Sequence, residues 1–144
     1  MVIKILSRIL LASSALVFAL GAWIHTSAFD RMSASVAKSD LPAFFGNGFR
    51  VLWLQDSALQ IVFAILFALV AIRPSVATRW VIAIVALIPL TTAMMIYCFI
   101  GNFIGGHIFL AGGLAAVLGG LMLPGSRQIN RIDKIPDFAD KSFR

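Results

Sequence analysis

The sequence predicts an all-α membrane protein, a four-transmembrane-helix antiparallel bundle with its N- and C-termini cytoplasmic. The 144 residues are 60% hydrophobic and only 12% charged, far more apolar than an average globular domain. Four apolar windows approach the roughly 20 residues that a helix needs to cross a hydrocarbon core of about 30 Å. Lysine and arginine gather on one side of these windows, which sets the direction in which each helix crosses.

The bundle is expected to occupy residues 1–123, with spans at about 5–24, 51–72, 80–100 and 104–123. Short connections make the last three spans antiparallel neighbours. The first window has features of a cleaved signal peptide, namely early basic residues and small residues after an apolar run. Its apolar run is longer than the about 7 to 15 residues of a signal-peptide core, which favours an uncleaved helix.

Basic residues orient the bundle, because positive charge near the ends of spans stays in the cytoplasm. With the N-terminus inside, nine basic residues fall on the cytoplasmic side and only Arg31, Lys38 and Arg50 fall outside. The net charge of +6 is therefore explained by topology, and no nucleic-acid partner is expected. We expect a multi-pass protein of a bacterial-type inner membrane, surrounded by the lipid bilayer.

The two remaining segments are polar. Residues 25–50 are expected to form an outer loop with short structure of its own, in which Pro42, Phe44 and Phe45 suggest a piece lying in the membrane interface. Residues 124–144 are expected to form a cytoplasmic tail that mixes basic, acidic and apolar residues. The tail either lies on the anionic inner leaflet or only solubilises the chain end.

A seven-residue glycine repeat marks the last span. Small residues let transmembrane helices approach closely, so the repeat is interpreted as a packing surface. We predict that it meets a stripe of alanines at positions 12, 15, 19 and 22 of the first span. The alternative is that it contacts another subunit, in a homodimer or larger membrane complex. The packing residues are Gly105, Gly106, Gly112, Gly113, Ala116, Gly119 and Gly120.

Polar side chains inside spans are costly and therefore indicate functional positions. Nearly all of them fall in the outer half of the bundle, which predicts a pocket open to the outside and shut towards the cytoplasm. Asp56 is the strongest candidate, with a purely structural, hydrogen-bonded aspartate as the rival interpretation. Gln60 lies one turn deeper and Trp53 one turn shallower on the same helix face. The candidates for ligand binding are Asp56, His107, His25, Gln60, Tyr97, Trp53, Asn102 and Thr92.

His25, Asp56 and His107 together have the composition of a divalent metal site. At 100° per residue, however, His107 points away from the stripe centred on Gly113 and Gly120, so an interfacial polar role is the alternative for each histidine. Haem ligation by the two histidines has less support, because nothing else in the sequence selects for it. Cys98 is the only cysteine, which excludes an intrachain disulfide and a CxxC redox pair.

These observations favour an accessory, sensing or ligand- or lipid-binding membrane component with an outward-facing polar pocket. One alternative is a metal-dependent or acid-base membrane enzyme that uses Asp56 with His25 and His107, although the chain has no GxGxxG, HExxH or GxSxG motif. The other is a small proton-coupled transporter. A transporter needs a carboxylate that is reachable from both sides, and Asp56 lies off-centre in its span.

Overall fold

The computed structural model describes residues 2–123, and the tail predicted at 124–144 lies outside these described residues. Four segments in the described part are long and apolar enough to span a membrane, which confirms the predicted all-helical class with four apolar helices. The elements are α1 (Val2–Ser27), α2 (Phe29–Ala37), α3 (Ala43–Ile72), the short 3-10 helix η1 (Pro74–Val76), α4 (Arg79–Phe99) and α5 (Ile104–Leu121).

The segment 25–50, expected as a loop, is mostly helical. Only Ala28 separates α1 from α2, and its N–H still donates to the Ile24 carbonyl at 3.2 Å. The Met32 N–H donates in turn to the Ala28 carbonyl at 3.1 Å, so the helical hydrogen bonding nearly continues across the break. The polar composition of α2 suggested a loop. Residues 29–37, however, contain no glycine or proline, the two residues least favourable in a helix interior.

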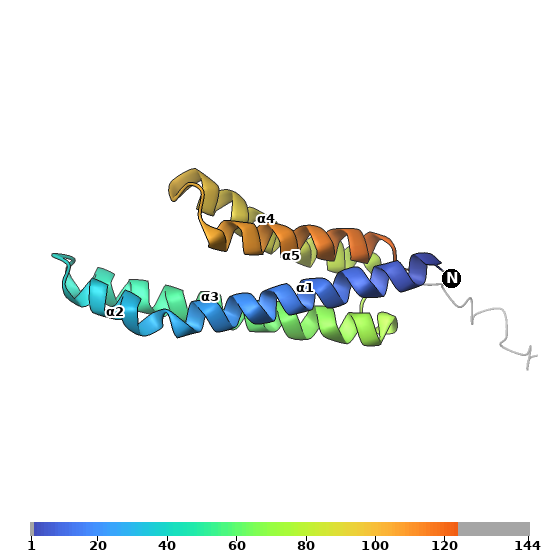
Figure 1. The fold of residues 1–144 in the computed structure, drawn as a ribbon, viewed down its shortest axis with the longest axis horizontal. Coiled ribbons are helices and arrows are strands. Elements are labelled where there is room, and N and C mark those ends of the chain that lie inside the picture. Colours follow the sequence, from blue (N-terminus) through green and yellow to red (C-terminus); the bar gives the residue numbers. More distant parts are fainter. Residues whose placement is uncertain (1, 124–144) are drawn as a thin grey trace, which may run out of the picture.

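The second half of that segment joins α2 to the start of α3 as a helical hairpin. Arg50 on α3 donates from Nε to Ser33 Oγ and from Nη1 to Asn47 Oδ1, both at 2.8 Å. Gly46 lets the two helices approach, since a Cβ there would lie 3.1 Å from Val36 Cγ1. The α1–α2 segment of 36 residues is about 54 Å long at 1.5 Å per residue. The hairpin therefore projects beyond α4 and α5 (Figure 1).

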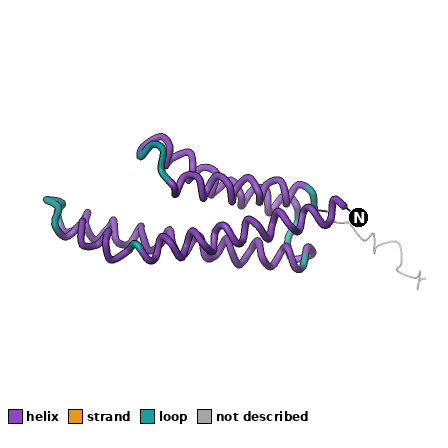
Figure 2. Tube along the Cα trace, viewed as in Figure 1, coloured by secondary structure: helices purple, strands orange, loops and turns teal. Residues whose placement is uncertain are grey.

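The helices are arranged as two antiparallel pairs. α1 packs on α3 at one side and on α5 at the other, and α5 also packs on α4. The pairs lie close near the N-terminus and separate towards the hairpin (Figure 1), with the longer loops gathered at the two ends (Figure 2). We name the end with the N-terminus and η1 the closed end. The end with the hairpin and the α4–α5 turn is the open end.

The α1–α5 interface is close because α5 presents glycine to α1. A Cβ at Gly112 would lie 2.7 Å from the Phe18 ring, and one at Gly119 would lie 2.9 Å from Leu11 Cγ. Both distances are shorter than ordinary van der Waals contact, so only glycine allows this separation of the helices.

A second set of glycines on α5 faces α4. A Cβ at Gly113 would lie 2.8 Å from Leu90 Cδ2, and one at Gly120 would lie 2.6 Å from Ile82 Cγ2. The glycines at 112, 113, 119 and 120 thus contact helices of the same chain on both sides of α5.

The predicted alanine stripe on α1 is wrong at Ala12 and Ala19, which are exposed, whereas Ala15 and Ala22 are buried. The residues that meet α5 include serines with the same seven-residue spacing as the glycines. Ser7 Oγ donates to the Gly119 carbonyl at 2.7 Å and Ser14 Oγ donates to the Gly112 carbonyl at 2.8 Å. Across such a close contact a serine hydroxyl can donate a hydrogen bond to a backbone carbonyl of the facing helix, whereas alanine has no donor.

Four phenylalanines fill the middle of the bundle between α1, α3 and α5. The Phe18 ring centroid lies 5.2 Å from that of Phe63 and 5.9 Å from those of Phe67 and Phe109. None of the four side chains is more than 3% exposed. This aromatic cluster separates the tightly packed closed end from the open end.

Candidate functional site

A cavity of about 110 Å³ lies on the open-end side of the aromatic cluster, with Phe109 in its wall. We call it the deep cavity. It adjoins a larger hollow of about 580 Å³ between the hairpin and the α4–α5 turn, the hairpin groove. His25, Trp53, Asp56, Ile96 and Phe103 line both spaces, so the polar residues of the site stand where the two meet.

The cavity begins where the seven-residue repeat of α1 has glycine in place of serine. Continuing the pairs of Ser7 with Gly119 and Ser14 with Gly112 by seven residues pairs Gly21 with Gly105, and both glycines line the deep cavity. A Cβ at Gly21 would collide with Gln60 Oε1 of α3 and lie 2.8 Å from Ile108 Cγ2. Glycine at this step therefore makes room for a polar side chain from a third helix.

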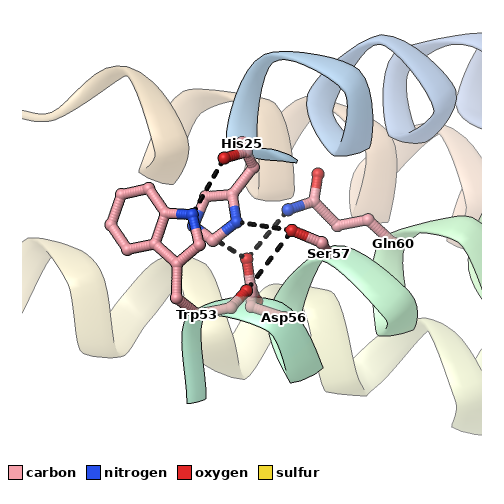
Figure 3. Close-up of polar contacts among 5 residues, drawn as sticks. All are labelled: His25, Trp53, Asp56, Ser57 and Gln60. Carbon is pink, nitrogen blue, oxygen red and sulfur yellow. Dashed lines mark hydrogen bonds and ion pairs between the residues drawn. The ribbon is translucent and has the colours of Figure 1, made fainter. Parts of the chain in front are cut away.

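The polar core of the site joins α1 to α3 (Figure 3). Asp56 Oδ2 accepts a hydrogen bond from Gln60 Nε2 at 2.8 Å. The same oxygen lies 3.5 Å from His25 Nε2, and the side chains of His25 and Asp56 are 23% and 27% exposed. The separation exceeds the usual 2.7–2.9 Å of a charge-assisted hydrogen bond, so the imidazole compensates the carboxylate only in part.

Trp53 fixes the position of the imidazole. Its indole Nε1 donates to the His25 backbone carbonyl at 2.8 Å. The two rings are stacked, with centroids 4.0 Å apart and planes inclined by 14°. Because Trp53 also lines both spaces, its emission reports directly on what enters them.

Ser57 completes the cluster and was missed by the sequence reasoning. Its Oγ lies 2.9 Å from His25 Nδ1 in a hydrogen bond, and donates to the Trp53 carbonyl at 3.3 Å. A hydroxyl has one proton, so Ser57 accepts from a protonated His25 Nδ1 while it donates to the Trp53 carbonyl, or donates to an unprotonated Nδ1 instead. Ser57 is only 4% exposed and lines neither space, which makes it a positioning group rather than an accessible nucleophile.

His107 belongs to a different group of side chains. Gly101, with φ +91°, turns the chain between α4 and α5 and brings Tyr97, Asn102 and His107 together. The Tyr97 hydroxyl lies 2.7 Å from His107 Nδ1, and His107 Nε2 lies 2.8 Å from Asn102 Oδ1. Both ring nitrogens of this exposed histidine are therefore engaged at the turn, where an amphipathic ring suits a membrane interface.

The three residues considered for a metal site are thus divided. His25 and Asp56 come together, and His107 pairs with Tyr97 and Asn102 instead. Among residues 2–123 no group of three histidine, cysteine, aspartate or glutamate side chains is placed to hold a metal ion. Thr92 lines the hairpin groove, but its hydroxyl donates to the Ile88 carbonyl at 3.0 Å and contributes no bond to Asp56.

Comparison of this chain with protein-family models, with curated proteins and with solved structures finds no match.

Proposed function

We propose that this protein is a small multi-pass component of a bacterial-type inner membrane that binds an amphiphilic ligand from the outer side. The polar end of the ligand enters the deep cavity and its apolar part follows the hairpin groove. Such a component serves as an accessory or sensing protein, because the site offers binding groups and few groups for chemistry.

One observation carries this proposal: a polar cluster stands where two adjoining spaces meet, and the rest of their lining is mostly apolar. The deep cavity is walled by Ile24, Ile104 and Ile108 besides its polar residues. The hairpin groove is within the about 300–1,000 Å³ of typical ligand pockets. A few polar groups in a largely apolar hollow are the usual composition of a small-molecule site.

The distribution of charge supports an outward-facing open end. Lys4, Arg8, Arg73 and Arg79 lie on the helices and the turn of the closed end, whereas three basic residues lie on the hairpin. Positive charge favours the cytoplasmic side. This supports an orientation with the N-terminus inside and the hairpin outside.

The two alternative functions have less support. An enzyme built on Asp56 with both histidines would need His107 at the site, and His107 is hydrogen bonded to Tyr97. A proton-coupled transporter would need Asp56 to be reachable from the closed end too. The aromatic cluster and the close α1–α5 contact lie in that direction, as the burial of Phe18 at 0% exposure indicates.

Protection of a cysteine in the cavity wall tests the binding function. Cys98 is replaced by serine and Ile108 by cysteine, and the reaction with a membrane-impermeant maleimide is followed in vesicles. Three single-chain probes are added in turn: octylammonium, octanol and octanoate. We expect at least one to slow the reaction at Ile108→Cys in a saturable way, because the bound probe occupies the space beside residue 108.

The matched control is Asp40→Cys in the same Cys98→Ser protein, since Asp40 is exposed at the hairpin tip and lines neither space. Its reaction rate should not change with any probe. If none of the three probes protects Ile108→Cys, or if all protect both positions equally, the protein does not bind amphiphiles in this cavity.

A further inference from the structure

The donors and acceptors of the deep cavity are unequally used. Each of its polar donor atoms already makes a contact inside the protein. Trp53 Nε1 donates to the His25 carbonyl and Gln60 Nε2 donates to Asp56 Oδ2, each at 2.8 Å. The His25 ring nitrogens face Ser57 Oγ and Asp56 Oδ2. Within the described residues of this cluster, the second N–H of Gln60 Nε2 is the donor left for a ligand whose polar end only accepts hydrogen bonds.

The acceptors, in contrast, are left over. Gln60 Oε1 is buried without a hydrogen-bond partner among the described residues, in a side chain that is 2% exposed. A buried polar atom without a partner is destabilising and calls for a partner that the structure does not contain. Asp56 has capacity as well, because an ionised carboxylate offers about four lone-pair sites and only Oδ2 is hydrogen bonded by a described residue.

The negative charge of Asp56 is only partly balanced by positive charge at the site. Among residues 2–123, Asp56 is the one acidic residue that lines either space, and no lysine or arginine lines them. The basic group that faces Asp56 is the His25 imidazole at 3.5 Å. A partly buried carboxylate with so little compensation is best stabilised by a cation that also donates hydrogen bonds.

From these three observations we propose that the deep cavity binds the protonated primary amine of an amphiphile, with its N–H groups donating to Gln60 Oε1 and to the Asp56 carboxylate. This inference rests on the proposed binding function and names the chemical class of the ligand. The cavity of about 110 Å³ is several times the roughly 30 Å³ of a water molecule, which suits an ammonium group and its first methylenes. The hydrocarbon chain continues along Ile96 and Phe103 into the hairpin groove.

A titration of Trp53 emission tests this ligand class. Trp23 and Trp80 are replaced by phenylalanine, so that Trp53 is the only tryptophan, and the full-length protein is placed in vesicles of phosphatidylcholine, a lipid without a primary amine. Octylammonium, octyltrimethylammonium and octanol are titrated at pH 7. We expect octylammonium to bind at least about tenfold more tightly than the other two, because one lacks N–H donors and the other lacks charge.

Two substitutions and one control assign the effect to the site. Asp56→Asn removes the charge and Gln60→Met removes the unpaired acceptor with little change in volume. Each should weaken octylammonium binding about tenfold or more, while the octanol midpoint changes less. Asp30→Asn, at an exposed acidic residue of α2, should leave both midpoints unchanged. If one of the two site variants does not fold, the other still decides the outcome.

The results separate the two proposals. Saturable binding of all three probes with equal midpoints would overturn the amine assignment while leaving the amphiphile-binding function intact, and would mean that Gln60 Oε1 is satisfied by water. A loss of the saturable signal for every probe would overturn both. Where octylammonium is preferred, adding lysophosphatidylethanolamine identifies the source of the amine. Tighter binding of the lysolipid indicates a lipid headgroup, and weaker binding indicates a free amine without a phosphate.

Discussion

The two ends of the α1–α5 interface follow one seven-residue register and have opposite properties. At the closed end, Ser7 and Ser14 donate to the carbonyls of Gly119 and Gly112 at 2.7 and 2.8 Å, and the helices are in close contact. At the open end the same register reaches Gly21, which carries no hydroxyl and borders a cavity. A stripe of small residues therefore gives close helix packing where the side chains of the two helices contact each other directly. Where a side chain from a third helix lies beside the stripe, as Gln60 lies beside Gly21, a cavity remains.

Phe18 stands at the boundary of the two regions, and Phe18→Ala should have the largest effect on stability. The side chain is fully buried among three other phenylalanine rings, and removing a buried phenylalanine costs about 3–5 kcal/mol. Reversible unfolding in mixed micelles, followed by circular dichroism, measures this loss. A loss below about 1 kcal/mol would mean that no aromatic cluster separates the two ends.

A pair of glycine substitutions compares the ends directly. Gly119→Ala at the closed end would place a Cβ 3.1 Å from the Ser7 carbonyl oxygen and 3.1 Å from Leu10 Cβ, which are not flexible groups. We expect a loss of about 1–3 kcal/mol from overpacking. In Gly105→Ala the nearest atom is Phe103 Cε1 at 2.9 Å, in a side chain that is 46% exposed and that can move aside.

The same unfolding measurement ranks the two variants. Gly105→Ala should cost less than about 1 kcal/mol, because a mobile side chain relieves the contact. Equal losses for the two variants would contradict the distinction between a closed and an open end.

The serine hydrogen bonds should contribute a smaller amount. Ser7→Ala combined with Ser14→Ala removes both bonds to α5 without adding volume, and interhelical hydrogen bonds in membranes average about 0.6 kcal/mol each. The double variant is therefore expected to lose about 1 kcal/mol and to keep octylammonium affinity unchanged. A change in affinity larger than the change in stability would show that the closed end controls the site.

Gly21→Ala should have a modest effect on stability and a clear effect at the site. The new Cβ collides with Gln60 Oε1 and lies 2.8 Å from Ile108 Cγ2, so these two side chains must shift, at a cost of about 1 kcal/mol. The shift of Gln60 moves its amide from Asp56, so the affinity for octylammonium should fall although the fold is retained. Unchanged affinity would mean that Gln60 takes no part in binding.

The sequence was sufficient to predict the four apolar helices and the shared helix face of Trp53, Asp56 and Gln60, but not the approach of His25 to Asp56. Polar residues are rare in spans, so His25, Trp53 and Gln60 stand out, and helix periodicity places Gln60 and Trp53 on the face of Asp56. The register of α1 was available too, since Ser7, Ser14 and Gly21 repeat with the spacing of the glycines. The alanines were preferred because small apolar residues are the commoner packing signal.

Other features depend on how the helices rotate and could not be derived from spacing. Ser57 is an ordinary helix residue by type, and only the contact between α1 and α3 gives it a role beside His25. The separation of His107 from Asp56 follows from the turn at Gly101, which commits the second histidine to Tyr97 and Asn102. The position of Gln60 Oε1 likewise depends on the packing of α1, α3 and α5, because Gly21 of α1 makes room for the Gln60 side chain beside Ile108.

The most direct test of the account is the access of water to α5 at two neighbouring positions. In Cys98→Ser protein, Ile108→Cys faces the deep cavity, whereas Ala111→Cys lies at an exposed position of α5 that the proposed topology turns towards lipid. We expect an impermeant maleimide to modify Ile108→Cys much faster than Ala111→Cys, and only in vesicles whose original outer face is exposed to the reagent. Equal rates at the two positions, or modification of Ile108→Cys only in inverted vesicles, would contradict an outward-facing cavity.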